Sequence, residues 1–280
     1  MDTGRLEDAI RAAGLDAHRD TILSAVRPAI YIGLGAAGQG GVGQSRIGGL
    51  PDLPDSIPWP VDPTLGRLRS FLLQIRLAEL PPFPENPLPS RGMLYLFADE
   101  NEDHADQLLV YTGDEPLRPR RPPEGAELIT DWYDDLAPHG LVFDLGADLP
   151  RWATRDYYAL VEAIADGDED GAEETMEALG WALGGGHAGK LLGHAAGIGY
   201  DPREDAYVMR EVNPAWRYAY DRRRTLDMAG AARWTHLLTV DSVDEVNLMF
   251  GDAGYLQVLA HEDDLRRGDF SRVWLNLESS

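Results

Sequence analysis

The spacing of apolar residues separates this chain into helical and extended stretches. Over residues 5–26 apolar side chains recur every three to five positions with charges between them, which predicts an amphipathic helix. Gly14 is expected to break it, and Pro28 ends it because the residue before proline avoids the helical region. Residues 154–183 carry two more apolar stripes of helical spacing. Both stretches are predicted to be helical.

Other apolar runs have the pattern of strands. In the run Phe71–Leu77 alternate residues are apolar on one side, and Met93–Ala98 is nearly continuous, as in a strand that is buried on both faces. Gln74 lies on the second face of its strand, where a buried amide must find partners. We expect further strands at 29–32, 108–112, 127–133, 140–145, 234–242, 255–260 and 269–277, and one more helix at 213–232.

A glycine-rich run follows the first predicted strand. Gly33, Gly35 and Gly38 match the spacing of a dinucleotide-binding loop. That site also needs a helix that opens at the third glycine, and the glycine-rich segment 39–43 is a poor helix former. We therefore expect a flexible loop and no nucleotide cofactor.

The stretch Ser45–Pro60 is the most distinctive part of the sequence. It contains Arg46, then Gly48–Gly49, then several prolines around Trp59. Proline forbids a helix and stiffens an extended path. The stretch is interpreted either as a structural clasp over a sheet or as the rigid lip of a pocket. The clasp is favoured, and Arg46 and Trp59 are the residues to test for function.

The pattern of this stretch returns near the C-terminus. Arg46–Gly49 is followed by the strand around Gln74 and a strand that begins after a glycine. Lys190–Gly193 is followed in the same way by His236–Val240 and a strand after Gly254. We interpret this as a degenerate internal duplication, which would bring Arg46 and Lys190 to similar positions in two β-units.

Charge and composition limit the classes of molecule that the protein is expected to bind and the chemistry that it can perform. With 25 basic and 48 acidic residues the net charge is −23, which opposes binding to nucleic acid and to anionic membranes and allows a basic protein partner. The chain has no cysteine, which excludes disulfides and thiolate chemistry. It has neither a signal-peptide pattern at its start nor a run of about 20 apolar residues, so a cytoplasmic protein is expected.

An acidic segment between the two middle helices resembles a calcium loop. Asp166, Asp168 and Asp170 alternate, and Gly171 and Glu177 fall at the sixth and twelfth positions of such a loop. The alternative is a solvated acidic turn between two helices. We favour this alternative and therefore expect no metal site. No cofactor is expected.

The ordered series of motifs resembles the bacterial YwqG-like, or DUF1963, proteins. The matching pieces are Ser45–Pro54 with Trp59–Pro60, Phe71–Leu80, Gly92–Phe97, Lys190–Gly193, Leu237–Asp241, Met249–Gly254 and Asp269–Trp274. The resemblance implies an α+β fold with a mainly β, roll-like core and peripheral helices. We expect an N-terminal helical segment at 1–28 and one domain at 29–280, in which the helical stretch around 145–185 has no counterpart in the resemblance and is taken as an insertion. The family has no established activity. His194 and Thr239 depart from its pattern, which has proline and glutamine there.

Two hypotheses about function follow. The first is a non-enzymatic binding module, plausibly an immunity-type protein that neutralises a basic toxin, since no nucleophile–base set is present. The alternative is a small-molecule-binding protein or enzyme with a polar pocket near the Gly-Gly-Leu-Pro motif. Arg46, Gln74 and Lys190 would then hold the ligand under Trp59, and Asp52 or Asp252 could act as a base. A pocket that joins Arg46 to Lys190 would favour the second hypothesis.

Overall fold

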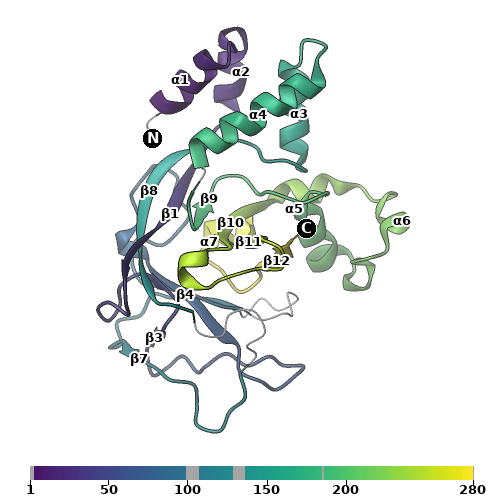
Figure 1. Ribbon diagram of the computed structural model, residues 1–280. Coiled ribbons are helices and arrows are strands. Elements are labelled where there is room, and N and C mark those ends of the chain that lie inside the picture. Colours follow the sequence, from purple (N-terminus) through teal and green to yellow (C-terminus); the bar gives the residue numbers. More distant parts are fainter. Residues whose placement is uncertain (1–2, 99–106, 129–135, 185, 280) are drawn as a thin grey trace.

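A single curled antiparallel sheet of ten strands dominates the computed structural model, which describes residues 3–98, 107–128, 136–184 and 186–279 (Figure 1). Its strands are β1 (Arg27–Ala37), β2 (Arg46–Ile47), β4 (Ser70–Arg76), β5 (Met93–Ala98), β6 (Leu108–Tyr111), β8 (His139–Asp148), β9 (Gly189–Leu192), β10 (Trp234–Asp241), β11 (Tyr255–His261) and β12 (Trp274–Glu278). β3 (Asp52–Leu53) and β7 (Arg118–Pro119) form a separate two-stranded sheet. The predicted α+β, mainly β fold is confirmed. Most of the strand expected at 127–133 lies outside the described residues.

The order of strands in the sheet reads alike from both ends. β8 and β1 pair at the centre. Outward from β8 lie β2, β4, β5 and β6, which we call the first unit, and outward from β1 lie β9, β10, β11 and β12, the second unit. Each unit is thus a short strand followed by three longer ones. The short strand of the first unit pairs with β8, and that of the second unit pairs with β1. This arrangement is what the proposed internal duplication requires.

The two units also agree in backbone detail. The pairing of β4 with β5 skips one residue at Leu72, and the pairing of β10 with β11 skips one at Leu237. Each short strand ends in two successive residues of left-handed conformation. These are Gly48 and Gly49 in the first unit, with φ of 70° and 72°, and Leu192 and Gly193 in the second, with φ of 60° and 79°. Left-handed pairs of this kind are uncommon for non-glycine residues, so the sequence echo marks a real structural repeat.

The flexible loop expected at Gly33 and Gly35 is wrong. Gly33 and Gly35 lie inside β1 and not in a flexible loop. A Cβ atom at Gly33 would lie 3.0 Å from Val142, and one at Gly35 would lie 3.1 Å from the carbonyl oxygen of Gly140. The glycines therefore let β8 approach β1 closely, which is a reason for glycine in a strand that has nothing to do with nucleotides.

Helices from two distant parts of the chain form one cluster at the end of the sheet (Figure 1). They are α1 (Gly4–Ala12), α2 (Arg19–Ser24), α3 (Arg155–Ile164) and α4 (Glu169–Gly184), with a 3-10 turn at Asp16–His18. Their buried apolar faces share a core that includes Ala147 and Leu149 at the end of β8. The N-terminal segment therefore packs on the segment expected as an insertion. The division into an N-terminal segment at 1–28 and one domain at 29–280 stays a prediction.

The single helix expected over 213–232 is wrong. That region contains 3-10 turns at Pro214–Trp216 and Met228–Arg233 and the short helix α6 (Tyr220–Arg223), after α5 (Pro202–Tyr207) and a π-helical turn at Val208–Val212. Asn213 accepts the N–H of Ala215, and Asp227 accepts that of Ala229. Each side chain starts a new turn in the way of an N-cap, which interrupts a continuous helix.

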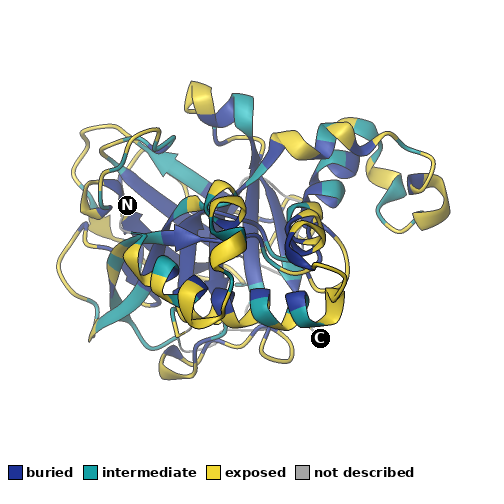
Figure 2. Ribbon diagram, turned by 90° about the horizontal axis from the view of Figure 1, so that it is seen from above, coloured by how far each residue is buried: buried dark blue, intermediate teal, exposed yellow. Residues whose placement is uncertain are grey.

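The largest core lies against one face of the sheet and takes residues from both units. Figure 2 shows buried residues concentrated on the strands and exposed residues gathered on the helices and loops, although β1 and β8 also carry intermediate and exposed residues. The remaining elements are 3-10 turns at Leu77–Glu79 and Asp244–Val246 and the helix α7 (Glu262–Arg267). Within the described residues, no helix has the length and apolar character needed to cross a bilayer.

Candidate functional site

Arg46 is at the centre of a buried polar cluster in the first unit. Only 1% of the residue is exposed, and its guanidinium lies 2.8 Å from the carboxylate of Asp52. It also donates to the carbonyl oxygen of Leu50. The second carboxylate contact comes from the N–H of Gly43, at 2.7 Å. The left-handed Gly48–Gly49 turn makes this possible, because it folds the chain back so that residues 50–52 return over Arg46.

Gln74 and Tyr95 complete this cluster. Gln74, the register partner of Arg46, accepts the N–H of Asp52 at 2.8 Å and donates to its carboxylate at 3.0 Å. Tyr95, the partner of Gln74 on the next strand, donates to the carbonyl oxygen of Asp52 at 2.6 Å. All these groups are buried, and the Oδ2 atom of Asp52 takes the contacts from Arg46, Gln74 and Gly43, while its Oδ1 atom has no hydrogen-bond partner among the described residues. The first unit is thus closed around Asp52.

Trp59 lies apart from that cluster. Its indole N–H donates to the carbonyl oxygen of Arg69 at 2.7 Å, and its ring meets the edge of Phe97. One side of the ring lines a cleft of about 720 Å³ between β6 and the loop 268–271 that precedes β12. The other lining residues are largely apolar and include Ile57, Pro58, Val61, Leu109, Val110 and Phe270.

Lys190 occupies in β9 the position that Arg46 has in β2, and its surroundings differ. Its ammonium lies 2.5 Å from Asp148, the last residue of β8. Asp148 also contacts Arg151 at 3.0 Å and accepts the N–H of His194 at 2.8 Å. Burial raises the pKa of Asp148, but the charges of Lys190 and Arg151 outweigh this and hold it well below its usual range. Burial lowers the pKa of Lys190.

Beside Lys190 the sheet leaves a polar cavity of about 150 Å³. Tyr31, Lys190, Thr239 and Gln257 are register partners across β1, β9, β10 and β11, so their side chains share one face. The corresponding row of the first unit is Gly140, Arg46, Gln74 and Tyr95. Thr239 occupies in the second unit the position that Gln74 has in the first, and its side chain is shorter. The cavity is lined by Tyr31, Arg151, His187, Gly189, Lys190, Ala196, Thr239, Asp241 and Tyr255.

Two groups that line the cavity beside Lys190 have no hydrogen-bond partner for their side chains among the described residues. The hydroxyl of Tyr255 is buried and unpaired. The carboxylate of Asp241 interacts with Lys190 and Arg151 only at longer range, and burial raises its pKa to about 6. Burial, with the nearby carboxylates Glu278 and Asp241, raises the pKa of Tyr255 above its usual range, so its phenol remains a donor.

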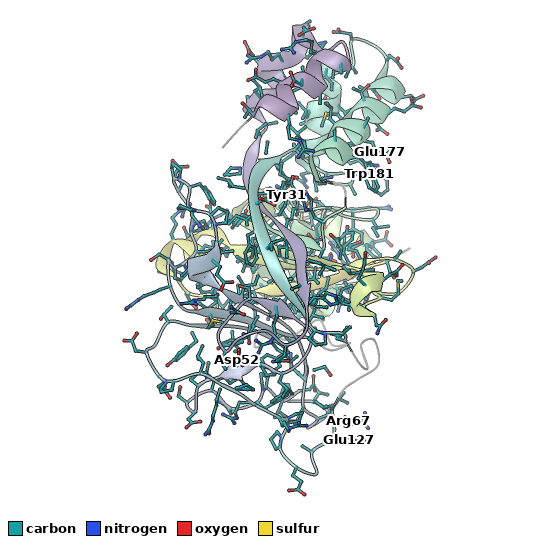
Figure 3. All side chains as sticks on the ribbon, turned by 60° about the vertical axis from the view of Figure 1, so that its left-hand side comes forward. Tyr31, Asp52, Arg67, Glu127, Glu177 and Trp181 are labelled. Carbon is teal, nitrogen blue, oxygen red and sulfur yellow. The ribbon has the colours of Figure 1, made fainter. Side chains whose placement is uncertain are left out.

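The structure brings some of the predicted site residues together and separates others. Arg46 and Gln74 are adjacent, whereas Lys190 lies beyond β8 and β1, and the cavity beside Lys190 is not lined by Arg46. Figure 3 shows this separation through Tyr31, beside the second-unit cavity, and Asp52, in the first-unit cluster. Of the two candidate bases, Asp52 is tied to Arg46, and Asp252 lies exposed in a turn.

Sequence reasoning missed the carboxylates around Lys190. Asp148 ends a strand, and Asp241 pairs in register with Tyr255. Asp148 accepts the N–H of His194 as Gln39 accepts that of Leu50. Gln39 lies close before Arg46 in the chain and Asp148 lies far before Lys190, so the sequence echo does not align these two residues.

The four carboxylates proposed for calcium do not gather. α4 begins at Glu169, so Asp170 and Glu177 lie on the helix, two turns apart. Asp168 accepts the N–H of Gly171, and Asp166 contacts His18. Within the described part of the chain, no three acidic or histidine side chains are placed to hold a metal ion.

The part of the chain that forms both units matches a known family. The family model "Domain of unknown function (DUF1963)" matches residues 45–278, from the first-unit cluster to the last strand. The chain is therefore a member of the DUF1963 family, as the motifs indicated. A comparison with proteins of curated function finds no match.

Proposed function

We propose that this protein is a non-enzymatic binding module for a basic protein partner, and that its role is of the immunity type, in which it neutralises a basic toxin. The observation that carries the proposal is the apolar cleft beside β6, together with the charge of the chain.

The cleft has the features of a site for an extended peptide segment. β6 is the outermost strand of its end of the sheet and pairs only with β5 among the described strands. A strand edge with unpaired backbone groups accepts an added strand, and adjacent apolar pockets select its side chains. Trp59 and Phe270 provide aromatic surface on the two walls of the cleft. Val61, at the rim, is 42% exposed.

The net charge favours a cationic partner. At −23 the molecule attracts basic proteins over distances of about a Debye length, roughly 8 Å at physiological ionic strength. Such attraction raises the rate of association more than it lowers the rate of dissociation. The partner is therefore expected to present apolar residues for the cleft, flanked by Lys or Arg.

The test is co-purification with the immobilised protein at low and high salt, followed by affinity measurements on the Val61→Lys variant. Val61→Lys is expected to weaken binding of the captured basic protein by about tenfold. Val142→Lys is the matched control, because it adds the same charge at an exposed valine of β8 outside the cleft. Equal effects of the two variants, or partners that are not basic, would contradict the proposal.

A further inference from the structure

The polar cavity of the second unit is lined by charges of both signs. Lys190 and Arg151 contact Asp148, and Asp241 lies on the same face of the sheet as Lys190, two residues along β10 from Thr239, the register partner of Lys190. Two cations and two carboxylates balance when Asp241 is ionised. A lone anion or a lone cation would disturb this balance, whereas a molecule with both charges would keep it.

The cavity is also lined by hydrogen-bond donors and by an acceptor. An ammonium has three donors, and that of Lys190 has one carboxylate partner, Asp148. The hydroxyl of Tyr255 is a buried donor without a partner. The carboxylate of Asp241 receives no hydrogen bond from the described residues. Asp241 is half-buried, whereas the hydroxyl of Tyr255 is buried, and a buried polar group without a partner is costly to stability. The hydroxyl of Tyr255 therefore points to something outside the chain that completes it.

We propose that this cavity is a binding site for a small zwitterion of the α-amino-acid type. Its carboxylate lies against Lys190 and the hydroxyl of Tyr255, and its ammonium lies against Asp241. This site is separate from the apolar cleft of the proposed function and does not depend on it.

Size and access agree with a ligand of this class. A cavity of about 150 Å³ exceeds the roughly 30 Å³ share of one water molecule in the liquid several times, and it remains too small for a nucleotide or a folded peptide. Arg151 also lines a neighbouring cleft of about 330 Å³, with Trp152, Glu177 and Trp181. Trp181 is 68% exposed. Figure 3 labels Glu177 and Trp181 at the end of the molecule that holds Tyr31.

The first unit explains why only one such site exists in the repeat. There Gln74 and Tyr95 take the places of Thr239 and Gln257, and Asp52 takes the place of Ala196. The partners that a zwitterion would provide in the second unit are provided in the first by the carboxylate and backbone of Asp52.

The test is calorimetric titration of the full chain at about pH 7.5 with glycine, L-alanine and L-serine, with acetate and methylamine as single-charge probes. At least one amino acid is expected to bind with a dissociation constant at or below about 1 mM and to bind at least about tenfold more tightly than either single-charge probe. No binding of any of the three amino acids up to about 10 mM, or equal binding of acetate, would overturn the proposal.

Two variants locate the site. Tyr255→Phe removes only the unpaired hydroxyl and is expected to weaken amino-acid binding about tenfold while the protein stays folded. Tyr95→Phe makes the same change in the first unit and is expected to leave binding unchanged. Asp241→Asn is expected to lower amino-acid affinity and to raise that of acetate, because it removes the negative wall. Amino-acid binding that is equal in Tyr255→Phe and Tyr95→Phe would place the ligand elsewhere and overturn the proposal.

Discussion

The first and second units of the sheet share a backbone plan and use it in opposite ways. In the first, Arg46, Gln74 and Tyr95 all contact Asp52, and of its carboxylate only the Oδ1 atom is left without a hydrogen bond among the described residues. In the second, Thr239 stands in the place of Gln74, and a cavity opens beside Lys190. The comparison teaches that one backbone plan can hold either a closed polar row or a cavity, and that the side chains at positions 74, 95 and 52, or 239, 257 and 196, make the difference.

The units also differ in how they respond to acid. His194 and His236, which occupy the places of Leu50 and Phe71, are buried, and burial lowers their pKa values to about 4 and about 3. His236 contacts the carbonyl oxygen of Leu192 at 2.7 Å and the hydroxyl of Thr239 at 2.6 Å. Both histidines fold in the neutral form. The titrating groups of the interior are therefore concentrated in the second unit.

The largest effect is expected from breaking the closed cluster. Arg46→Ala leaves the buried carboxylate of Asp52 without its cation and is expected to cost about 3–5 kcal/mol in the free energy of unfolding. Denaturant unfolding measures this loss. Arg118→Ala is the control, because Arg118 pairs with Asp55 at the surface and its loss is expected to cost less than about 1 kcal/mol. If Arg46→Ala were as stable as Arg118→Ala, the first unit would not be a structural clasp.

A smaller effect, of opposite sign, is expected at the open cavity. The folded pKa of Asp241, about 6, lies above its ordinary value of 3.8, so the folded chain binds this proton more tightly than the unfolded chain. The contribution of Asp241 to stability is fully present below about pH 4 and is lost as the pH rises through about 6. At about pH 7.5, Asp241→Asn is therefore expected to raise the free energy of unfolding by about 1–3 kcal/mol.

The pH dependence of that gain is the check. Unfolding of the wild type and of Asp241→Asn should give the same free energy at about pH 4 and diverge as the pH rises past about 6. A difference that is constant with pH would show that the substitution acts through packing and not through the charge of Asp241.

Much of the fold was predictable from the sequence because strands leave a local pattern. The strands around Gln74 and around Leu96 were predicted close to their observed bounds, and so was the break at Gly14. Gly33 and Gly35 misled the prediction, because glycine signals a loop locally and here serves the close approach of β8, which is far away in sequence. The stretch 213–232 has the composition of a helix, but side-chain caps such as Asp227 start new turns within it and so interrupt the expected helix.

The sites were predictable only as far as the echo reached. Arg46, Gln74 and Lys190 were chosen correctly as polar residues of the sheet, because each stands in or beside a motif. The sequence does not show that Asp52 returns over Arg46 or that Asp148 and Asp241 flank Lys190. These contacts depend on the left-handed turns after β2 and β9 and on pairing between strands that are distant in the chain.

The contrast between a closed and an open unit is tested most directly by removing one phenol hydroxyl from each and measuring the free energy of unfolding without added ligand. Tyr95→Phe removes a buried bond to the carbonyl oxygen of Asp52 and is predicted to cost about 1–2 kcal/mol. Tyr255→Phe removes a hydroxyl that has no partner among the described residues and is predicted to cost nothing or to stabilise slightly. Equal losses in the two variants, or a larger loss for Tyr255→Phe, would contradict the account.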